Sequence, residues 1–153
     1  MQIQLASDLH LEMINRNFPR ERLIEPAPDA ELLVLAGDIH NGSTAFSLFR
    51  DWPVPVIYVA GNHEFYDGIF DTVLQELESD SKGTSIHFLE RESFVTGELR
   101  ILGCTLWTDY QLYGSDLESR RRAQDYCDSH LHDRRAISSG AGPFTAQLAL
   151  EQH

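Results

Sequence analysis

The sequence predicts an α/β fold built on a mainly parallel sheet. Three short apolar runs, at residues 3–7, 32–36 and 54–60, have the composition of buried strands. The segments between the runs are long enough for the crossover connections that parallel strands require. Each run stops abruptly at a group of polar residues, and in open sheets of this class ligands bind beyond the carboxyl ends of the strands.

The first two runs are almost entirely apolar, which is typical of central strands covered on both faces. Ser43 is placed to cap a short helix that continues to residue 50, and Pro53 then opens the third run. After that run, Asp67 is the expected N-cap of a second helix, and Gly83 follows its end. The stripe that this helix turns to the core consists of Ile69, Phe70, Val73, Leu74 and Leu77.

Shorter elements are expected in the second half of the chain. Two strands are predicted at residues 85–89 and 99–107, with a turn at residues 96–98 between them. Residues 111–135 are polar and are expected to be helical in part, and residues 138–143 are expected to form a loop. The final stretch has the pattern of an amphipathic helix that the sequence enters but does not complete.

The composition is that of a soluble globular protein, with 42% hydrophobic and 24% charged residues. A length of 153 residues is sufficient for a single domain with a sizeable core. The formal net charge of -12 disfavours nucleic acid as a partner, because its phosphates would be repelled unless a metal or a basic patch intervened.

The sequence also carries an expectation about the compartment. The chain does not start with a basic region followed by an apolar one, so we expect no secretory signal. No apolar run is long enough to span a membrane. The two cysteines, Cys104 and Cys127, favour reduced thiols in a cytoplasm over a disulfide framework. We therefore expect a cytoplasmic protein that does not engage a membrane.

Three polar groups stand directly after the three apolar runs. They are Asp8-Leu9-His10, Gly37-Asp38-Ile39-His40 and Gly61-Asn62-His63-Glu64. Asp8, Asp38 and Asn62 are separated by 30 and 24 residues, which fits successive strand–helix–strand passes. If the strands are neighbours, the two aspartates meet at one sheet edge and repel each other unless a proton or a cation separates them. The mixture of oxygen and nitrogen ligands suits manganese, iron or zinc better than calcium.

The three groups match, in order, the motifs D-x-H, G-D-x-[DH] and G-N-H-[DE]. One such group alone is also found in turns and helix caps, whereas three ordered groups at strand ends favour a shared site. The set resembles the calcineurin-like metallophosphoesterases. Residues 103–109, and residues 133–137 followed by 143–145, resemble a bacterial branch of that family, so the resemblance covers essentially the whole chain. It implies the layered α-β-β-α sandwich of the family, with residues 1–153 forming the N-terminal part of a single metallophosphoesterase domain.

The resemblance implies two divalent metal ions, most simply manganese, iron or zinc, that share a bridging carboxylate. A hydroxide between the ions is the nucleophile that this resemblance implies. On the same basis Asp8 and His10 bind the first ion, Asp38 bridges both ions, and Asn62 binds the second.

The resemblance also implies roles for the two residues that follow Asn62. His63 would face the phosphate without binding metal, and would stabilise the transition state or protonate the leaving oxygen. Glu64 is expected to orient His63 or to influence its charge. The implied activity is hydrolysis of phosphate mono- or diesters, as a phosphatase or a phosphodiesterase.

The later part of the sequence departs from the family pattern. The family carries a further His at a strand end and a final G-H-x-H, which complete both metal shells, and neither is found in this sequence. His130 and His132 have H-x-H spacing, but they lie in a charged stretch where a solvated helix surface is the better interpretation. His40 stays open between support of the site and an ordinary loop residue, and His87 is expected to be structural.

These departures lead to alternative hypotheses. The chain is interpreted as the N-terminal part of a longer metallophosphoesterase, which leaves its own activity open. The alternative is a catalytically weak or inactive scaffold that keeps the fold for protein binding. A nuclease is a third and weaker hypothesis, because the family includes nucleases but this chain is acidic.

Overall fold

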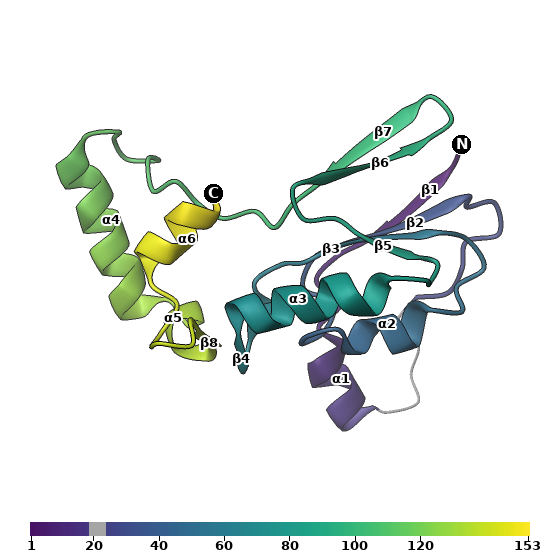
Figure 1. Cartoon of the computed structure of the whole chain (residues 1–153), viewed down its shortest axis with the longest axis horizontal. Coiled ribbons are helices and arrows are strands. Elements are labelled where there is room, and N and C mark those ends of the chain that lie inside the picture. Colours follow the sequence, from purple (N-terminus) through teal and green to yellow (C-terminus); the bar gives the residue numbers. More distant parts are fainter. Residues whose placement is uncertain (19–23) are drawn as a thin grey trace.

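The computed structural model describes residues 1–18 and 24–153 of the chain. Its centre is a four-stranded parallel sheet in the order β1-β2-β3-β5 (Figure 1). The strands are Ile3–Ala6 (β1), Leu32–Ala36 (β2), Val56–Val59 (β3) and Ile86–Phe88 (β5). Leu5 lies beside Val34, and Val34 beside Ile57, so the side chains of one face form continuous rows. The predicted parallel sheet is confirmed.

Three helices cover one face of this sheet (Figure 1). They are Leu11–Asn17 (α1), Thr44–Phe49 (α2) and Phe70–Ser81 (α3). The core between the sheet and the helices includes Leu33, Leu35, Val56 and Tyr58 from the strands and Phe46, Phe49, Val73 and Leu77 from the helices. The strand members of this core alternate along the sequence because successive side chains point to opposite faces of a sheet.

A hairpin covers part of the opposite face. Its strands, Glu92–Thr96 (β6) and Leu99–Gly103 (β7), pair in antiparallel fashion. The second, smaller core between the hairpin and the sheet consists of Leu32, Ile57 and Leu89, with Val34, Val59, Phe94 and Ile101 packed against them. Some apolar side chains beside this core are exposed to solvent: Leu5 of β1 is 69% exposed and Leu102 of β7 is 76% exposed.

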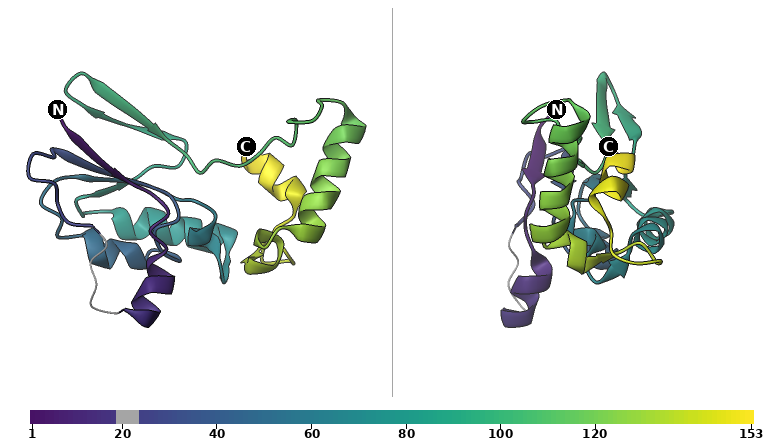
Figure 2. Two further views of the ribbon diagram at one scale, coloured as in Figure 1. Left: turned by 180° about the vertical axis from the view of Figure 1, so that it is seen from behind. Right: turned by 90° about the vertical axis from the view of Figure 1, so that its left-hand side faces the viewer.

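Residues 104–153 form an arm that leaves the hairpin and returns beside the start of α3 (Figure 2). The arm contains Leu117–His130 (α4), Asp133–Ala136 (α5), Ile137–Ser138 (β8) and Ala146–Gln152 (α6). Strand β8 pairs in parallel with Gly68–Ile69 (β4), which directly precedes α3. Phe144 of the arm stacks on Phe70 with 4.8 Å between ring centroids, and Trp107 lies 5.0 Å from Phe144. These contacts hold the arm next to the loop that follows β3.

One of the two predicted helix caps is confirmed in position and the other is wrong. Ser43 is the N-cap residue of α2, but its hydroxyl donates to the Asp80 carboxylate at 2.6 Å and makes no capping hydrogen bond. Asp67 is not the N-cap of α3, because that helix begins only after Ile69. The N–H of Asp67 instead donates to Ala136 O at 2.7 Å, beside the pairing of β4 with β8.

The prediction also misses β6 and misjudges β7. The strand that begins at Leu99 pairs with residues 92–96 and ends at Gly103, well before Trp107. A Cβ at position 103 would lie 2.6 Å from Leu89 Cβ, so the hairpin approaches the sheet closely at this glycine. The chain then turns away, and Trp107 packs against Phe144 of the arm and against Phe70 of α3.

Other predictions are confirmed. Gly83 follows α3 with a φ of +75°, which glycine adopts without strain. The polar stretch 111–135 is helical in part, as α4 and the start of α5, and Cys104 and Cys127 are free thiols. None of the helices within residues 1–18 and 24–153 has the length and apolar character needed to cross a bilayer.

Candidate metal centre

The loops that follow β1 and β2 run side by side at the carboxyl edge of the sheet. The N–H of Asp8 donates to Gly37 O at 3.0 Å, and the N–H of His10 donates to Asp38 O at 3.0 Å. One residue further on, Leu11 continues this pairing into the first turn of α1. The backbone hydrogen bonding of the sheet is thus extended past the strands, and it brings the first two polar groups of the sequence together.

Three side chains form a compact group at this edge. One ring nitrogen each of His10 and His63 and one carboxylate oxygen of Asp38 lie within 4.8 Å of one another. All three residues are half-buried, and the two imidazole rings meet edge-on with centroids 4.3 Å apart. A divalent ion binds nitrogen and oxygen ligands at roughly 2.0–2.2 Å, so a group of this size can close around one ion with small movements.

The backbone is strained at the residues that carry this group. Asp8, His10 and Asp38 have φ values of 54°, 45° and 57°, in the left-handed region that non-glycine residues rarely occupy. Such conformations cost about 1–3 kcal/mol each and persist where the surrounding structure holds them. The paired loops supply this support, and strain of this kind concentrates at ligand-binding sites.

Gly61 allows the third loop to approach the second. A Cβ at this position would lie 2.2 Å from Asp38 Oδ1 and 2.8 Å from the Asp38 backbone nitrogen. The same Oδ1 accepts a hydrogen bond from the His63 N–H at 3.0 Å. The glycine before Asn62 therefore has a steric reason, because only a residue without a side chain leaves room for the Asp38 carboxylate.

Glu64 is completely buried beneath the group. Its Oε2 accepts the N–H groups of Asp38 at 3.0 Å and Gly61 at 2.7 Å. Its Oε1 accepts the N–H of Ile39 at 2.8 Å and the hydroxyl of Tyr58 at 2.7 Å. Burial, and next the charge of Glu64, raise the pKa of Tyr58 well above its usual range, so this hydroxyl keeps the proton that it donates.

This position changes the interpretation of Glu64. The residue was expected to orient His63, but its carboxylate is fully engaged with the backbone of the two loops and with Tyr58. Within the described residues, the carboxylate that contacts the His63 ring is Glu12, whose Oε1 lies 3.3 Å from His63 Nδ1. Glu64 thus supports the shape of both loops and acts on His63 only through them.

Asn62 is oriented by a residue of the arm. Its Nδ2 donates to Asp133 Oδ1 at 2.9 Å and to the Tyr66 hydroxyl at 3.0 Å, and Tyr66 itself donates to Asp133 at 2.7 Å. Because a carboxylate only accepts, the amide nitrogen must face Asp133, and Oδ1 of Asn62 is left for another partner. Burial, together with the hydrogen bond and charge of Asp133, raises the pKa of Tyr66, which therefore remains a donor.

The family model of the calcineurin-like phosphoesterases matches residues 1–135 of the 153 residues. The chain belongs to the calcineurin-like phosphoesterase family. No curated protein matches the chain in sequence. The three motifs and the His10–Asp38–His63 group fall within the matched region, so the group is the candidate metal centre of this calcineurin-like phosphoesterase.

Two further predicted ligands of this phosphoesterase are Asp8 and Asn62. Asp8 is exposed, and within the described residues it belongs to no set of three converging His, Cys, Asp or Glu side chains. Asn62 lines a neighbouring hollow of about 650 Å³, on the sheet face opposite the helices, together with Asp133 and Trp107. The structure therefore gathers His10 and Asp38 as expected, and adds His63 in a position where it could also bind metal.

The remaining histidines of the phosphoesterase lie outside the group. His130 is exposed at the end of α4 with Nδ1 2.8 Å from Tyr126 O, and His132 is exposed with its ring edge-on to Tyr66. His40 is half-buried. Within the described part of the chain, its side chain has one hydrogen-bond partner, the backbone oxygen of the adjacent Asn41. These positions agree with the surface interpretation of the H-x-H pair.

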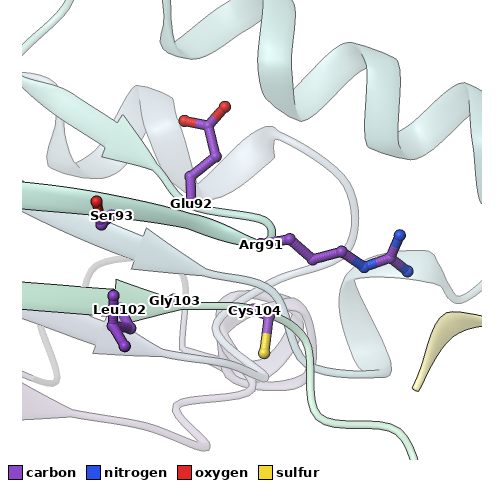
Figure 3. A pocket seen from close by; sticks show the side chains of 6 residues that line it. All are labelled: Arg91, Glu92, Ser93, Leu102, Gly103 and Cys104. Carbon is purple, nitrogen blue, oxygen red and sulfur yellow. The ribbon is translucent and has the colours of Figure 1, made fainter.

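A further hollow of the phosphoesterase, at the base of the hairpin, offers no second site (Figure 3). Its lining consists of Arg91, Glu92, Ser93, Leu102, Gly103 and Cys104. The side chains of Arg91 and Glu92 point in different directions, and Arg91 donates to the Gln152 side chain of the arm at 2.7 Å. No converging set of ligands results.

Sequence reasoning missed two residues, one that contacts the centre and one that orients the neighbouring Asn62. Glu12 stands two positions after His10 at the start of α1, and Asp133 lies 71 residues beyond Asn62. The stretch that contains Asp133 was noted for its resemblance to a bacterial branch of the family, but no local pattern connects it with Asn62. Only the return of the arm makes that connection.

Proposed function

We propose that this chain is a metal-dependent hydrolase of phosphate mono- or diesters, and that residues 1–153 form the N-terminal part of a single metallophosphoesterase domain. The observation that carries the proposal is the His10–Asp38–His63 group at the edge where three parallel strands end. Membership in the calcineurin-like phosphoesterase family supports the phosphoester as the substrate class.

The donors fit a divalent cation. Asp38 and Glu12 bring two carboxylates to the paired histidines His10 and His63, and a cation would offset their negative charge. Oε2 of Glu12 and Oδ1 of Asn41, in the loop after β2, are buried without a hydrogen-bond partner in the described structure. Imidazole and carboxylate ligands together favour manganese, iron or zinc over calcium.

We assign the ligands as follows. His10, Asp38 and Asp8 would hold a first ion, and Asp38 with Asn62 Oδ1 would hold a second. When bound, such ions polarise water and neutralise negative charge on a phosphate. Asp8 has to turn toward the group to take part, and its exposure leaves it free to do so.

His63 is the residue that we assign to proton transfer. Its backbone is held by Asp38 Oδ1, and its ring stacks on Tyr66 with centroids 4.1 Å apart. A positioned imidazole can donate a proton to the leaving oxygen of a phosphate ester, an effect that contributes about 100- to 10,000-fold in rate. Tyr66, kept protonated, forms a stable platform for that ring.

A scaffold for protein binding is the second candidate. It is favoured by the exposed positions of His130 and His132, which leave the centre without further imidazole ligands among the described residues. The exposed apolar side chains of Leu5 and Leu102 would suit protein contact.

Turnover of a chromogenic phosphodiester and of the matching monoester, with added manganese, tests the proposal. We expect hydrolysis that a chelator abolishes and that His63→Ala lowers about 100-fold or more. Asp38→Ala should weaken manganese binding, measured by calorimetry, more than Asp8→Ala, because Asp38 is assigned to both ions. Equal losses would indicate a single-metal site.

His87→Ala is the matched control, since His87 is exposed on β5 and packs against Phe94. It should leave turnover and metal binding unchanged. A chain that binds no manganese and hydrolyses neither ester would support the scaffold instead.

A further inference from the structure

Glu12 lies between the two histidines of the candidate metal centre. Its Oε1 is 3.4 Å from His10 Nδ1 and 3.3 Å from His63 Nδ1. We propose that Glu12 is a positioning residue, which fixes the tautomer and the orientation of both rings with one oxygen atom. The consequence for hydrolysis rests on the proposed function, whereas the effect on the rings does not.

The chemistry of the three groups determines which nitrogen carries the proton. An ionised carboxylate can only accept hydrogen bonds, so a ring nitrogen that faces it must be an N–H donor. Nδ1 of His10 and Nδ1 of His63 are therefore the protonated nitrogens of the neutral rings. Each Nε2 is left with its lone pair, as a metal ligand or a proton acceptor requires. On His63, Nε2 would first take up a proton from solvent, and the ring would then give that proton to the leaving oxygen.

The position of Glu12 fits an outer support better than a ligand. No oxygen of Glu12 joins the set formed by His10, Asp38 and His63 within 4.8 Å. Histidines that bind metal commonly donate their second N–H to a carboxylate, which sets the ring direction. Glu12 provides such a partner for the proposed ligand His10 and, with the same oxygen, for the proposed proton donor His63.

The ordinary alternative is a solvated glutamate on a short helix. The side chain of Glu12 is only 17% exposed, whereas that of Glu31 is 63% exposed. Its Oε2 is buried and has no hydrogen-bond partner in the described structure. Burying a carboxylate oxygen without a partner costs free energy, which the side chain would avoid by turning to water. We therefore infer that the contact with the two imidazoles holds the carboxylate in place.

Ring contacts restrict where the two imidazoles can lie, and Glu12 sets how they are turned. His63 stacks on Tyr66 on one side, and the edge of its ring meets His10 with 4.3 Å between centroids. Glu12 itself is carried by α1, whose first residue, Leu11, donates its N–H to Ile39 O at 2.9 Å. Displacement of α1 would therefore disturb both rings together.

The tautomers can be observed directly in the metal-free protein. With 15N-labelled histidine, long-range nitrogen–proton correlation spectra distinguish a neutral ring with Nδ1–H from one with Nε2–H. We expect Nδ1–H for His10 and His63 in the parent chain. Glu12→Ala should move both rings toward Nε2–H, while Glu12→Gln, which keeps an acceptor oxygen, should preserve the parent pattern.

Metal binding and turnover provide the second measurement. Glu12→Ala should weaken manganese binding about 10- to 100-fold, as is usual when the carboxylate partner of a ligating histidine is lost. It should also lower kcat, but not in a His63→Ala background, where the weaker manganese binding alone should remain. Glu76→Ala, at an exposed position of α3, is the matched control and should change nothing.

Two outcomes would overturn the role of Glu12. One is an Nε2–H tautomer for either ring in the parent chain, and the other is a pair of tautomers that Glu12→Ala leaves unchanged. If the tautomers shift as expected but the parent chain neither binds manganese nor hydrolyses esters, the proposed function fails while the positioning role stands. Far-UV circular dichroism of Glu12→Ala and Glu12→Gln separates these results from unfolding.

Discussion

Glu64 illustrates how a single buried charge can hold a site without touching its chemistry. A carboxylate that is 0% exposed is stable only when its oxygens are satisfied, and four donors satisfy them. Three of the donors are backbone N–H groups in the loops after β2 and β3. The geometry of Asp38 and of the turn at Gly61 therefore depends on Glu64, whose own side chain is buried below the metal centre.

Glu64→Gln should lower the free energy of unfolding by about 2–4 kcal/mol. The amide nitrogen of glutamine would face donors that now meet an oxygen, and each buried donor left unsatisfied costs about 1–3 kcal/mol. Urea denaturation followed by circular dichroism measures the change. Glu76→Gln, at an exposed position on α3, is the control and should stay within about 0.5 kcal/mol of the parent. A similarly small loss for Glu64→Gln would mean that the carboxylate is not needed to hold the loops.

At the scale of the element, the site is made by loops that continue the order of the sheet. The loop after β1 is hydrogen-bonded to the loop after β2, and the latter is packed against the turn at Gly61. Gly37, with a φ of +88°, faces Gly61, and a Cβ on it would lie 3.1 Å from Gly61 Cα. Two glycines thus let three loops approach more closely than side chains would permit.

Gly61→Ala should separate the second loop from the third. The new methyl group would lie 2.2 Å from Asp38 Oδ1, so either the carboxylate or the turn must move. We expect a loss of about 1–3 kcal/mol in the free energy of unfolding, as is typical of overpacking, and a weaker affinity for manganese in calorimetry. Gly142→Ala is the matched control, since a Cβ there meets nothing within 4 Å. If both variants have the same free energy of unfolding and the same affinity for manganese, the close approach at Gly61 contributes to neither.

Across the whole molecule, two buried tyrosines and the half-buried Tyr66 connect the sheet, the site and the arm. Tyr58 donates to Glu64 below the loops, and Tyr66 joins Asn62 to Asp133 of the arm. Within the arm, the Tyr110 hydroxyl accepts a hydrogen bond from Arg134 at 2.8 Å. Burial is the largest cause that raises the pKa of each tyrosine, and it raises the pKa of Tyr110 to about 12.

The stability of the protein should therefore fall as the pH rises from about 10, the ordinary pKa of tyrosine, to about 12. In this range the unfolded chain releases tyrosine protons that the folded chain retains, so the unfolded state binds fewer protons and gains stability. Below about pH 10 both states are protonated and this loss is absent.

The urea midpoint measured against pH, with tyrosinate absorbance recorded in parallel, checks this expectation. Tyr66→Phe should flatten the alkaline decline, because it removes one of the groups whose pKa is raised. Tyr113→Phe is the control, since Tyr113 is 89% exposed. A midpoint that is constant up to about pH 12 would show that the tyrosines ionise equally in both states.

Sequence patterns alone predict the parallel sheet, the order of its strands along the chain, the family and the convergence of His10 and Asp38. These depend on regular patterns, because apolar runs specify buried strands and strand ends in a parallel sheet must share an edge. The roles of Asp8, His10, Asp38, Asn62 and His63 stay predictions that metal binding and turnover have to test.

The groups that surround those side chains follow from the folded arrangement of distant segments. Glu12 reaches His63 across 51 residues, Asp133 reaches Asn62 across 71, and Glu64 turns inward to the backbone instead of toward its neighbour His63. Likewise, the hydroxyl of Ser43 donates to Asp80, 37 residues further along the chain, instead of capping its own helix. A local pattern encodes which side of a strand or helix is apolar, whereas the partner of a polar atom depends on which distant segment folds against it.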